Sequence, residues 1–192
     1  MSHYKRMLRR AWFRFQWTQQ GIAAVEFAAV LPFLVVLFLG TVELSRYTIA
    51  AQKTEKAAMT ISDLVAQAED ITTGDMDVLV LAVQEVMQPF AFDGNGYVII
   101  SSVSRVGSGA ATVNWQYTGG GTWTQSSQIG GEGLTATLPT GFALDPNEGI
   151  IIAEVYFNYT PMMLDAVMPN TNTLYKIGVF KPRLGELTSI GS

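Results

Sequence analysis

The sequence contains no cysteine and a single histidine, His3. A chain without cysteine has no disulfide framework and no thiolate site. Because the one histidine lies near the N-terminus, the rest of the chain holds no Ser-His-Asp triad and no zinc site built from His and Cys. Serine–lysine chemistry and carboxylate pairs remain available, but no spacing in the sequence supports them. We therefore expect a protein that is not an enzyme and that uses no cofactor and no metal ion.

Positive charge is scarce after the first 21 residues. The chain has 192 residues, with 12 Lys and Arg against 16 Asp and Glu and a formal net charge of −4. Residues 1–21 carry five bases and no acid, whereas residues 43–192 carry 15 acids and seven bases. Basic residues collect on the cytoplasmic side of a membrane span, so we expect the N-terminus inside and the acidic part outside. The acidic part argues against nucleic acid as a partner, and anionic lipid explains the basic segment better.

One long apolar segment separates these two charge regions. Residues 22–42 are apolar except for Glu26 and Thr41. At 1.5 Å per helical residue the segment covers about 31 Å, which matches the ~30 Å hydrocarbon core of a bilayer. The sequence thus predicts one transmembrane helix over 22–42. A secretory signal peptide fits less well, because the apolar run is too long and its exit at 39–43 offers poor small-x-small sites.

Two residues inside this segment, Glu26 and Pro32, are unusual in a transmembrane helix. A charge at bilayer depth costs on the order of 2.5–3.5 kcal/mol on insertion scales, so we interpret Glu26 as a functional group with a partner. Pro32 removes one backbone donor at mid-span and is expected to kink or loosen the helix. It is either a weak point that lets the helix change shape or a tolerated membrane proline.

Gly21 lies five residues before Glu26, and the segment reads Gly-Ile-Ala-Ala-Val-Glu-Phe followed by Ala-Ala-Val-Leu-Pro. This pattern resembles the processing site of type IV pilins and pseudopilins, and its form is similar to the TadE-like branch of the tight adherence (Tad) pilus system. The resemblance implies that a prepilin peptidase cuts between Gly21 and Ile22. Glu26 is then the fifth residue of the mature chain and Phe27 the sixth. In that family the carboxylate is thought to pair with the new α-amino group of an adjoining subunit, here the amino group of Ile22.

The resemblance also implies a function, partners and a location. The chain would be a minor pseudopilin, a structural or assembly component of a Tad-type pilus or secretion apparatus. Its partners would be the membrane, the prepilin peptidase, other Tad pilins and pseudopilins, and the inner-membrane assembly platform. It would lie in the bacterial inner membrane with a cytoplasmic N-terminus and a head that is periplasmic, or extracellular in an assembled fibre. The alternative is an uncleaved single-pass membrane anchor whose exported head binds a partner.

Four regions follow from these expectations. Residues 1–21 are a basic cytoplasmic leader that is expected to be cleaved, and residues 22–42 are the transmembrane helix. Residues 43–69 continue as an amphipathic helix, because small and apolar residues recur there at alternating spacings of three and four. That stripe packs either on the chain's own domain or against neighbouring subunits. Residues 70–192 form an exported α+β head domain.

The head domain is predicted to combine a second helix with a mostly antiparallel, pilin-like sheet. The helix is expected over 75–88 with Thr73 or Asp75 as its cap, although its aliphatic run could also be a buried strand. Turn signals and runs rich in Val, Ile and aromatic residues predict strands over 97–105, 111–117, 122–126, 150–159 and 174–181. We expect one face of the sheet to cover the helices and the other to meet water.

Three further features of the head domain are open to interpretation. Trp115 and Trp123 either stack across a hairpin or form an exposed adhesive patch. Residues 127–149 are expected to form a long surface loop. Asp145, Asn147 and Glu148 in this loop resemble cation ligands, but their spacing is not that of an EF-hand. The residues after Pro182 are expected to be loosely held.

Overall fold

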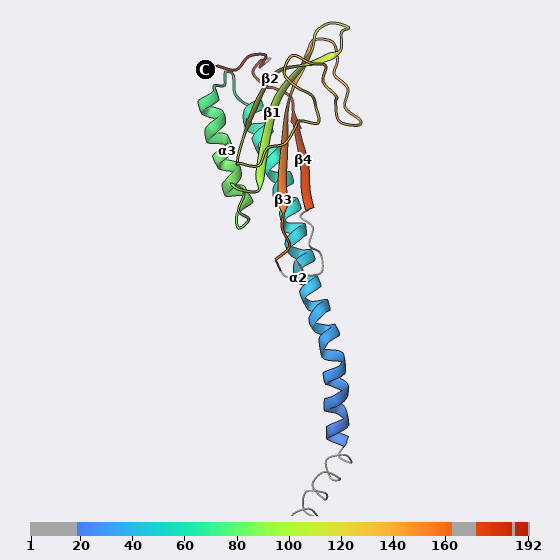
Figure 1. Ribbon diagram of the computed structural model, residues 1–192. Helices are drawn as coiled ribbons and strands as arrows, with labels where there is room; N and C mark the ends of the chain where they lie inside the picture. The colour runs from blue at the N-terminus through green and yellow to red at the C-terminus, as the bar shows by residue number, and fades with distance from the viewer. Residues whose placement is uncertain (1–18, 163–171, 186, 192) are drawn as a thin grey trace, which may run out of the picture. The chain divides into compact units, whose positions relative to one another are not determined.

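The computed structural model describes residues 19–162, 172–185 and 187–191. These residues form two long helices and one four-stranded antiparallel sheet, which confirms the predicted α+β class (Figure 1). The chain divides into two compact units, an N-terminal unit of Met1–Ser45 and a C-terminal unit of Arg46–Ser192. The sheet and the second helix belong entirely to the C-terminal unit.

Helix α2 runs from Gln19 to Ala66 and contains the whole apolar segment 22–42. It is long and apolar enough to cross a membrane, and its most apolar stretch is not buried by any other part of the described chain. The helix continues through Pro32 without ending. It ends three residues before the predicted end at 69, close to the turn that the Asp-Ile-Thr-Thr-Gly sequence predicts.

Helix α3 spans Thr73–Met87, and its cap differs from the prediction. The N-cap is Thr72 rather than Thr73 or Asp75. Its hydroxyl oxygen accepts a hydrogen bond from the Asp75 N–H at 3.2 Å, and the Asp75 carboxylate accepts one from the Thr72 N–H at 3.0 Å. This reciprocal capping box satisfies two donors at the helix start, and the bonds from Thr72 lower the pKa of the Asp75 carboxyl. The alternative that this stretch is a strand is therefore wrong.

The sheet has the strand order β2-β1-β3-β4. Its strands are β1 (Gly96–Arg105), β2 (Ala111–Gly119), β3 (Glu148–Tyr159) and β4 (Asn172–Phe180), and all neighbours are antiparallel. A bulge at Ser102/Val103 shifts the register between β1 and β2. The predicted strand over 122–126 is wrong, because that stretch is irregular and pairs with no strand.

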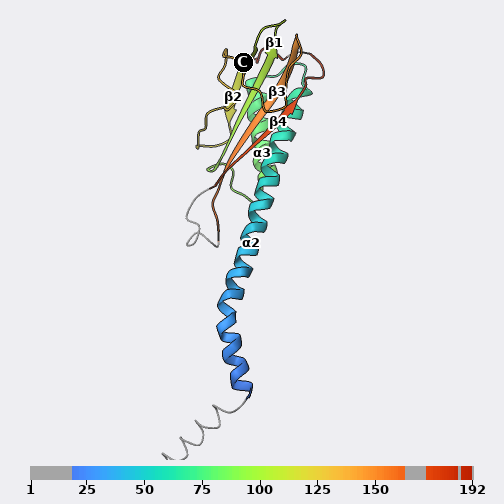
Figure 2. The same ribbon diagram turned by 90° about the vertical axis from the view of Figure 1, so that its right-hand side faces the viewer.

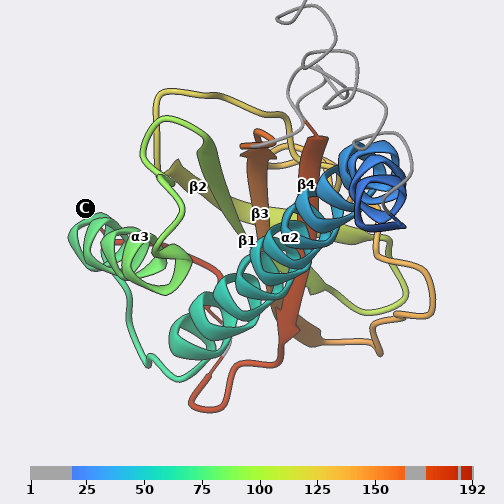
Figure 3. The same cartoon turned by 90° about the horizontal axis from the view of Figure 1, so that it is seen from below.

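One face of the sheet packs against α3 and the part of α2 that follows Arg46 (Figures 2 and 3). Side chains alternate between the two faces along β3, since Ala153, Val155, Phe157 and Tyr159 all join this core. Helix α2 approaches β4 at Gly178, where an added Cβ would come within 3.0 Å of the Ala58 carbonyl oxygen. The sequence stripe of small residues on α2 is therefore a packing surface for the chain's own sheet.

The other face of the sheet is also covered, contrary to the expectation that it meets water. We call the stretch between β2 and β3, residues 122–147, the cover segment. Ile129 and Leu144 of this segment are buried against residues of β1, β2 and β3, namely Val103, Val113, Ile150 and Ile152. The Val113 N–H donates to the Leu134 carbonyl at 3.0 Å, so the segment also follows the outer edge of β2. The predicted loop over 127–149 is irregular as far as residue 147, where β3 follows, but it is packed rather than a free surface loop.

The chain after β4 is bound to the core between the sheet and the two helices. The prediction of a loosely held tail is therefore wrong for the described residues. Leu187 is buried, and its carbonyl accepts hydrogen bonds from the Ser102 hydroxyl at 2.6 Å and the Trp115 Nε1–H at 2.8 Å. The Gly191 N–H donates to the Ile71 carbonyl at 2.8 Å. Trp115 is thus a core residue, and neither interpretation of a Trp115–Trp123 pair holds.

Candidate functional site

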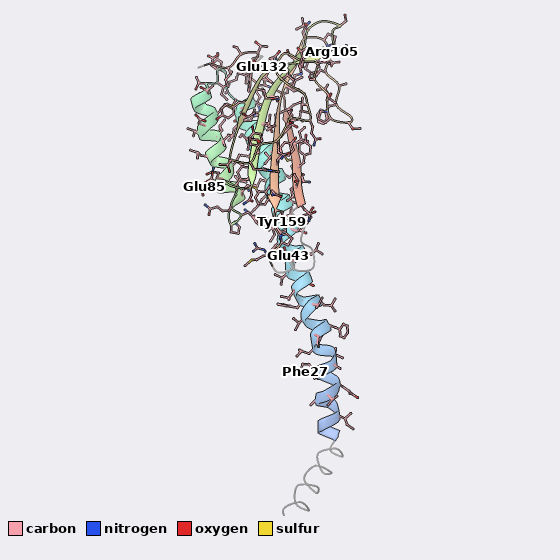
Figure 4. All side chains as sticks on the ribbon, in the orientation of Figure 1. Phe27, Glu43, Glu85, Arg105, Glu132 and Tyr159 are labelled. Atoms are coloured by element: carbon pink, nitrogen blue, oxygen red, sulfur yellow. The ribbon has the colours of Figure 1, made fainter. Side chains whose placement is uncertain are left out.

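The residues predicted to carry function lie near the start of α2, within the N-terminal unit. The Gly21–Ile22 peptide bond lies two residues after Gln19, where the described helix begins. Ile22 and Phe27 are 55% and 60% exposed, and Glu26 is also exposed. Figure 4 shows the Phe27 side chain projecting away from the helix. The bond and the carboxylate are therefore both accessible to another protein.

Glu26 forms no hydrogen bond and no ion pair with any residue that the structure describes. The sequence explains this, because no Lys, Arg or His occurs between Arg14 and Arg46. A helix brings residues three and four positions apart together, and those positions around Glu26 are all apolar. A cation for Glu26 must therefore come from outside the described part of α2.

The surroundings of Glu26 are apolar on every side of the helix. Large apolar side chains are exposed all along this part of α2, at Val25, Val30, Phe33, Val36, Leu37 and Phe38 among others. A helix that is apolar all round is stable only inside a membrane or against other protein. Pro32 adds a local weakness, because it has no N–H for the Ala28 carbonyl. Whether the helix bends there in function stays a prediction.

The C-terminal unit contains a second charged group, whose burial was not predicted from the sequence. Glu154 lies in the middle of β3 and is 0% exposed. One carboxylate oxygen, Oε1, accepts the Gln128 N–H at 2.8 Å and the Tyr175 hydroxyl at 3.0 Å. The other oxygen accepts the Ser127 hydroxyl. Glu154 therefore binds the cover segment to the middle of the sheet.

The two tyrosines beside Glu154 are held as neutral hydrogen-bond donors. Burial raises the pKa of both Tyr156 and Tyr175, and the negative charge of Glu154 raises both further. The Tyr156 hydroxyl also donates to the Ser126 carbonyl at 2.9 Å. Both hydroxyls therefore stay protonated at neutral pH and position the cover segment against the sheet. The signal in the sequence was the lone acid in the apolar run of β3.

The loop residues considered as cation ligands are used differently. The Glu148 carboxylate accepts the Asp145 N–H at 2.7 Å and pairs with the Lys181 ammonium at 2.7 Å. The bond from Lys181 is the largest cause of a lowered pKa at Glu148. The described residues contain no cluster of three or more His, Cys, Asp or Glu side chains placed to hold a metal ion. These groups thus fix the loop to the end of β4.

Residues 21–62 match the family model of TadE-like proteins. This match confirms the resemblance over the segment that carries Gly21, Glu26 and most of α2, and it covers less than a quarter of the chain. No curated protein and no solved structure matches the sequence.

Proposed function

We propose that this chain is a minor pseudopilin, a structural or assembly component of a Tad-type pilus or secretion apparatus, and that a prepilin peptidase processes it after Gly21. The TadE-like match suggests a component associated with a Tad pilus, and the apolar part of α2 is consistent with membrane anchoring. The processing and the specific role within the assembly are our inference.

One observation carries the proposal. The matched segment begins at Gly21 and places a single carboxylate, without a partner in the described chain, five residues later in an exposed apolar helix. An acid in such a helix is costly unless something offsets its charge. Cleavage between Gly21 and Ile22 offers a direct solution, because it creates a new α-amino group near the acid.

The chemistry of this new amine suits Glu26. A free α-amino group has a pKa near 8 and is therefore charged at neutral pH. Opposite charges survive in an apolar medium mainly as hydrogen-bonded pairs. An ion pair between Glu26 and the Ile22 amine of an adjoining subunit would satisfy both groups at once. It would also set the register of two apolar helices that have few other polar features.

The C-terminal unit fits a structural role. Both faces of its sheet are packed, and its buried carboxylate is held by neutral donors. The functional partners we propose are the membrane, the prepilin peptidase, other Tad pilins or pseudopilins and the assembly platform of the inner membrane. The C-terminal unit would lie on the periplasmic side, or outside the cell in an assembled fibre.

The cleavage is tested by intact-mass spectrometry of membrane-extracted protein from the native host. We expect a mature chain that begins at Ile22, and we expect the Gly21→Leu variant to keep residues 1–21, because the peptidase cleft must accept a residue with almost no side chain. Gly40→Leu is the matched control, since a side chain at Gly40 meets nothing within 4 Å. A wild-type chain that begins at Met1 or Ser2, with no shorter species, would establish the uncleaved anchor instead.

The role of Glu26 is tested separately. We expect Glu26→Gln to be cleaved normally but to enter or support pili poorly, because the neutral amide cannot pair with the ammonium. Glu85→Gln removes an exposed acid from α3 and is the control for the loss of one charge. Pilus counts by electron microscopy at wild-type level for cleaved Glu26→Gln protein would refute the pairing.

A further inference from the structure

Aromatic rings and one cation gather at one end of the C-terminal unit. The ring of Tyr47 meets that of Tyr159 edge-on, with centroids 5.4 Å apart, and the ring of Phe90 lies 6.2 Å from Tyr159. The Arg46 guanidinium carbon lies 5.6 Å from the centroid of Phe90. We call Arg46, Tyr47, Phe90 and Tyr159 the base cluster. Figure 4 shows Tyr159 and Glu85 toward one end of the unit, and Arg105 and Glu132 toward the other.

Arg46 is under-satisfied within the described chain. Its Nε is the one buried side-chain nitrogen or oxygen atom with no hydrogen-bond partner among the described residues. Three other cations of the unit, Lys176, Lys181 and Arg183, each form a salt bridge, but Arg46 forms none with any described residue. Arginine has five donors in a planar fork that suits carboxylate and phosphate oxygens. Although Nε itself is shielded, Arg46 as a residue is only half-buried, which leaves its guanidinium open to an acceptor from outside the described chain.

The length of chain between the apolar segment and Arg46 limits where this cation can lie. Arg46 follows residue 42 by four positions. Four residues cover about 6 Å as a helix and at most about 14 Å fully extended. The headgroup layer on each side of a bilayer is roughly 5–8 Å thick. If residues 22–42 span the membrane, Arg46 lies in or close to the headgroup layer for any arrangement of the two units.

We propose that the base cluster docks on phospholipid headgroups and that the Arg46 guanidinium binds a lipid phosphate. Guanidinium and phosphate form short, charge-assisted hydrogen bonds that are frequently bidentate. Aromatic rings with one polar end are enriched at the level of the headgroups, which is the place for Tyr47 beside Arg46. This docking rests on the membrane insertion in the proposed function, but it does not depend on cleavage after Gly21.

The net negative charge of residues 43–192 makes the positive charge of Arg46 important for docking on an anionic bilayer. Residues 43–192 carry 15 acids and seven bases, so an anionic bilayer repels this part of the chain as a whole. A single cation at the contact offsets this repulsion locally. One Lys or Arg near an anionic membrane changes the bound-to-free ratio by about fivefold. Loss of the Arg46 charge should therefore lower the ratio of docked to undocked protein by about that factor.

The absence of cysteine in the wild-type sequence makes the test direct, because a single engineered cysteine can carry a fluorophore. We would replace exposed Ala91, next to Phe90, and in a second protein exposed Glu132, near the other end of the unit. The full chain is placed in vesicles of phosphatidylethanolamine and phosphatidylglycerol (3:1) that contain lipid spin-labelled at the headgroup. We expect strong quenching at position 91 and little at position 132.

Two variants in the Ala91→Cys protein then assign the contact. Arg46→Gln should lower the ratio of docked to undocked protein about fivefold, and Arg46→Lys should restore part of it because the charge returns without the planar fork. Lys56→Gln, which removes another cation of α2, should leave the quenching unchanged. Unchanged tryptophan fluorescence would show that each variant is folded, since Trp115 is buried in the core.

The outcomes separate this inference from the proposed function. Release of the protein by alkaline carbonate would refute membrane insertion itself. Retention in the membrane without quenching at position 91, or with equal quenching in Arg46→Gln, would overturn the docking alone. Loss of quenching on addition of about 20 mM inorganic phosphate would show that Arg46 prefers free phosphate, which would overturn the assignment to lipid.

Discussion

Replacement of Glu154 by leucine should loosen the cover segment and destabilise the C-terminal unit. Leucine is similar in size but accepts no hydrogen bond. The Gln128 N–H and the Tyr175 hydroxyl would lose the acceptor that Oε1 provides. Tyr156 would keep the Ser126 carbonyl as an acceptor. The Ser127 hydroxyl would lose the acceptor that the other carboxylate oxygen provides. The expected cost therefore comes from three orphaned donors.

The magnitude follows from those three donors. A buried donor left without a partner costs about 1–3 kcal/mol, so the three together cost about 3–9 kcal/mol. Glu154→Gln is the matched control. Its amide oxygen can replace Oε1, and its NH₂ group can donate to Ser127, so only about 1 kcal/mol of charge-assisted bonding is lost. Because domains are stable by roughly 5–15 kcal/mol, the leucine variant would be close to the limit of folding.

The assay is urea unfolding of the full-length protein in detergent, followed by tryptophan fluorescence. Hydrogen exchange read by mass spectrometry would locate the effect. We expect the backbone amides of Gln128 and Ile129 to exchange faster in Glu154→Leu and nearly as in wild type in Glu154→Gln. The reasoning would be refuted if the leucine variant were as stable as the wild type. That result would mean that the packing of Ile129 and Leu144 against the sheet holds the cover segment without the carboxylate.

Three smaller changes test other contacts of the same unit. Gly178→Ala should cost at least about 2 kcal/mol in the same urea assay, because the added methyl group overlaps the backbone of α2 at Ala58. Thr72→Ala should cost about 1 kcal/mol through loss of the cap of α3, seen as faster amide exchange in its first turn. Burial, and then the bond to Asp77, raise the pKa of Tyr117 to about 12. Because this pKa is higher in the folded state, Tyr117 contributes to stability below pH 10, and that contribution is lost as the pH rises from 10 to 12. The free energy of unfolding should therefore fall less steeply with pH over that window in Tyr117→Phe than in the wild type.

The fold class was readable from the sequence because its main signals are periodic. The apolar run 22–42 predicts a helix by its length, and the alternation from Ile150 to Tyr159 predicts a strand with two distinct faces. Both predictions depend on local chemistry, and the structure agrees with both. The ends were less accurate, as at Thr72, where two adjacent threonines and a nearby aspartate offered competing caps.

The cover segment and the tail could not be predicted in the same way, because both are fixed by contacts between residues far apart in the chain. Residues 122–126 have the composition of a strand but find no partner strand, and the segment follows the sheet through Glu154 and through Ile129 instead. Leu187 is held by the side chain of Trp115, 72 positions earlier. The local sequence of a Gly-rich loop or a short tail does not predict contacts with such distant residues.

The functional residues also differ in whether local sequence or distant contacts determine their role. Gly21 and Glu26 form a local motif, so the sequence alone suggested their role. The burial of Glu154 depends on Ser127 and Gln128, which a different part of the chain supplies. An acid within an apolar strand was the available clue, and it pointed to burial only if the second face of the sheet was known to be covered.

The bonds that tie Leu187 and Gly191 to Trp115 and Ile71 have a consequence for the order in which this protein matures. A ribosome makes the chain from its N-terminus, so α2, α3 and all four strands exist before these last contacts can form. Until then the indole nitrogen of Trp115 and the linker between the two helices lack their final partners. These contacts can therefore form only after residues 187–191 have left the ribosome, so the unit cannot complete its packing while they are still being made.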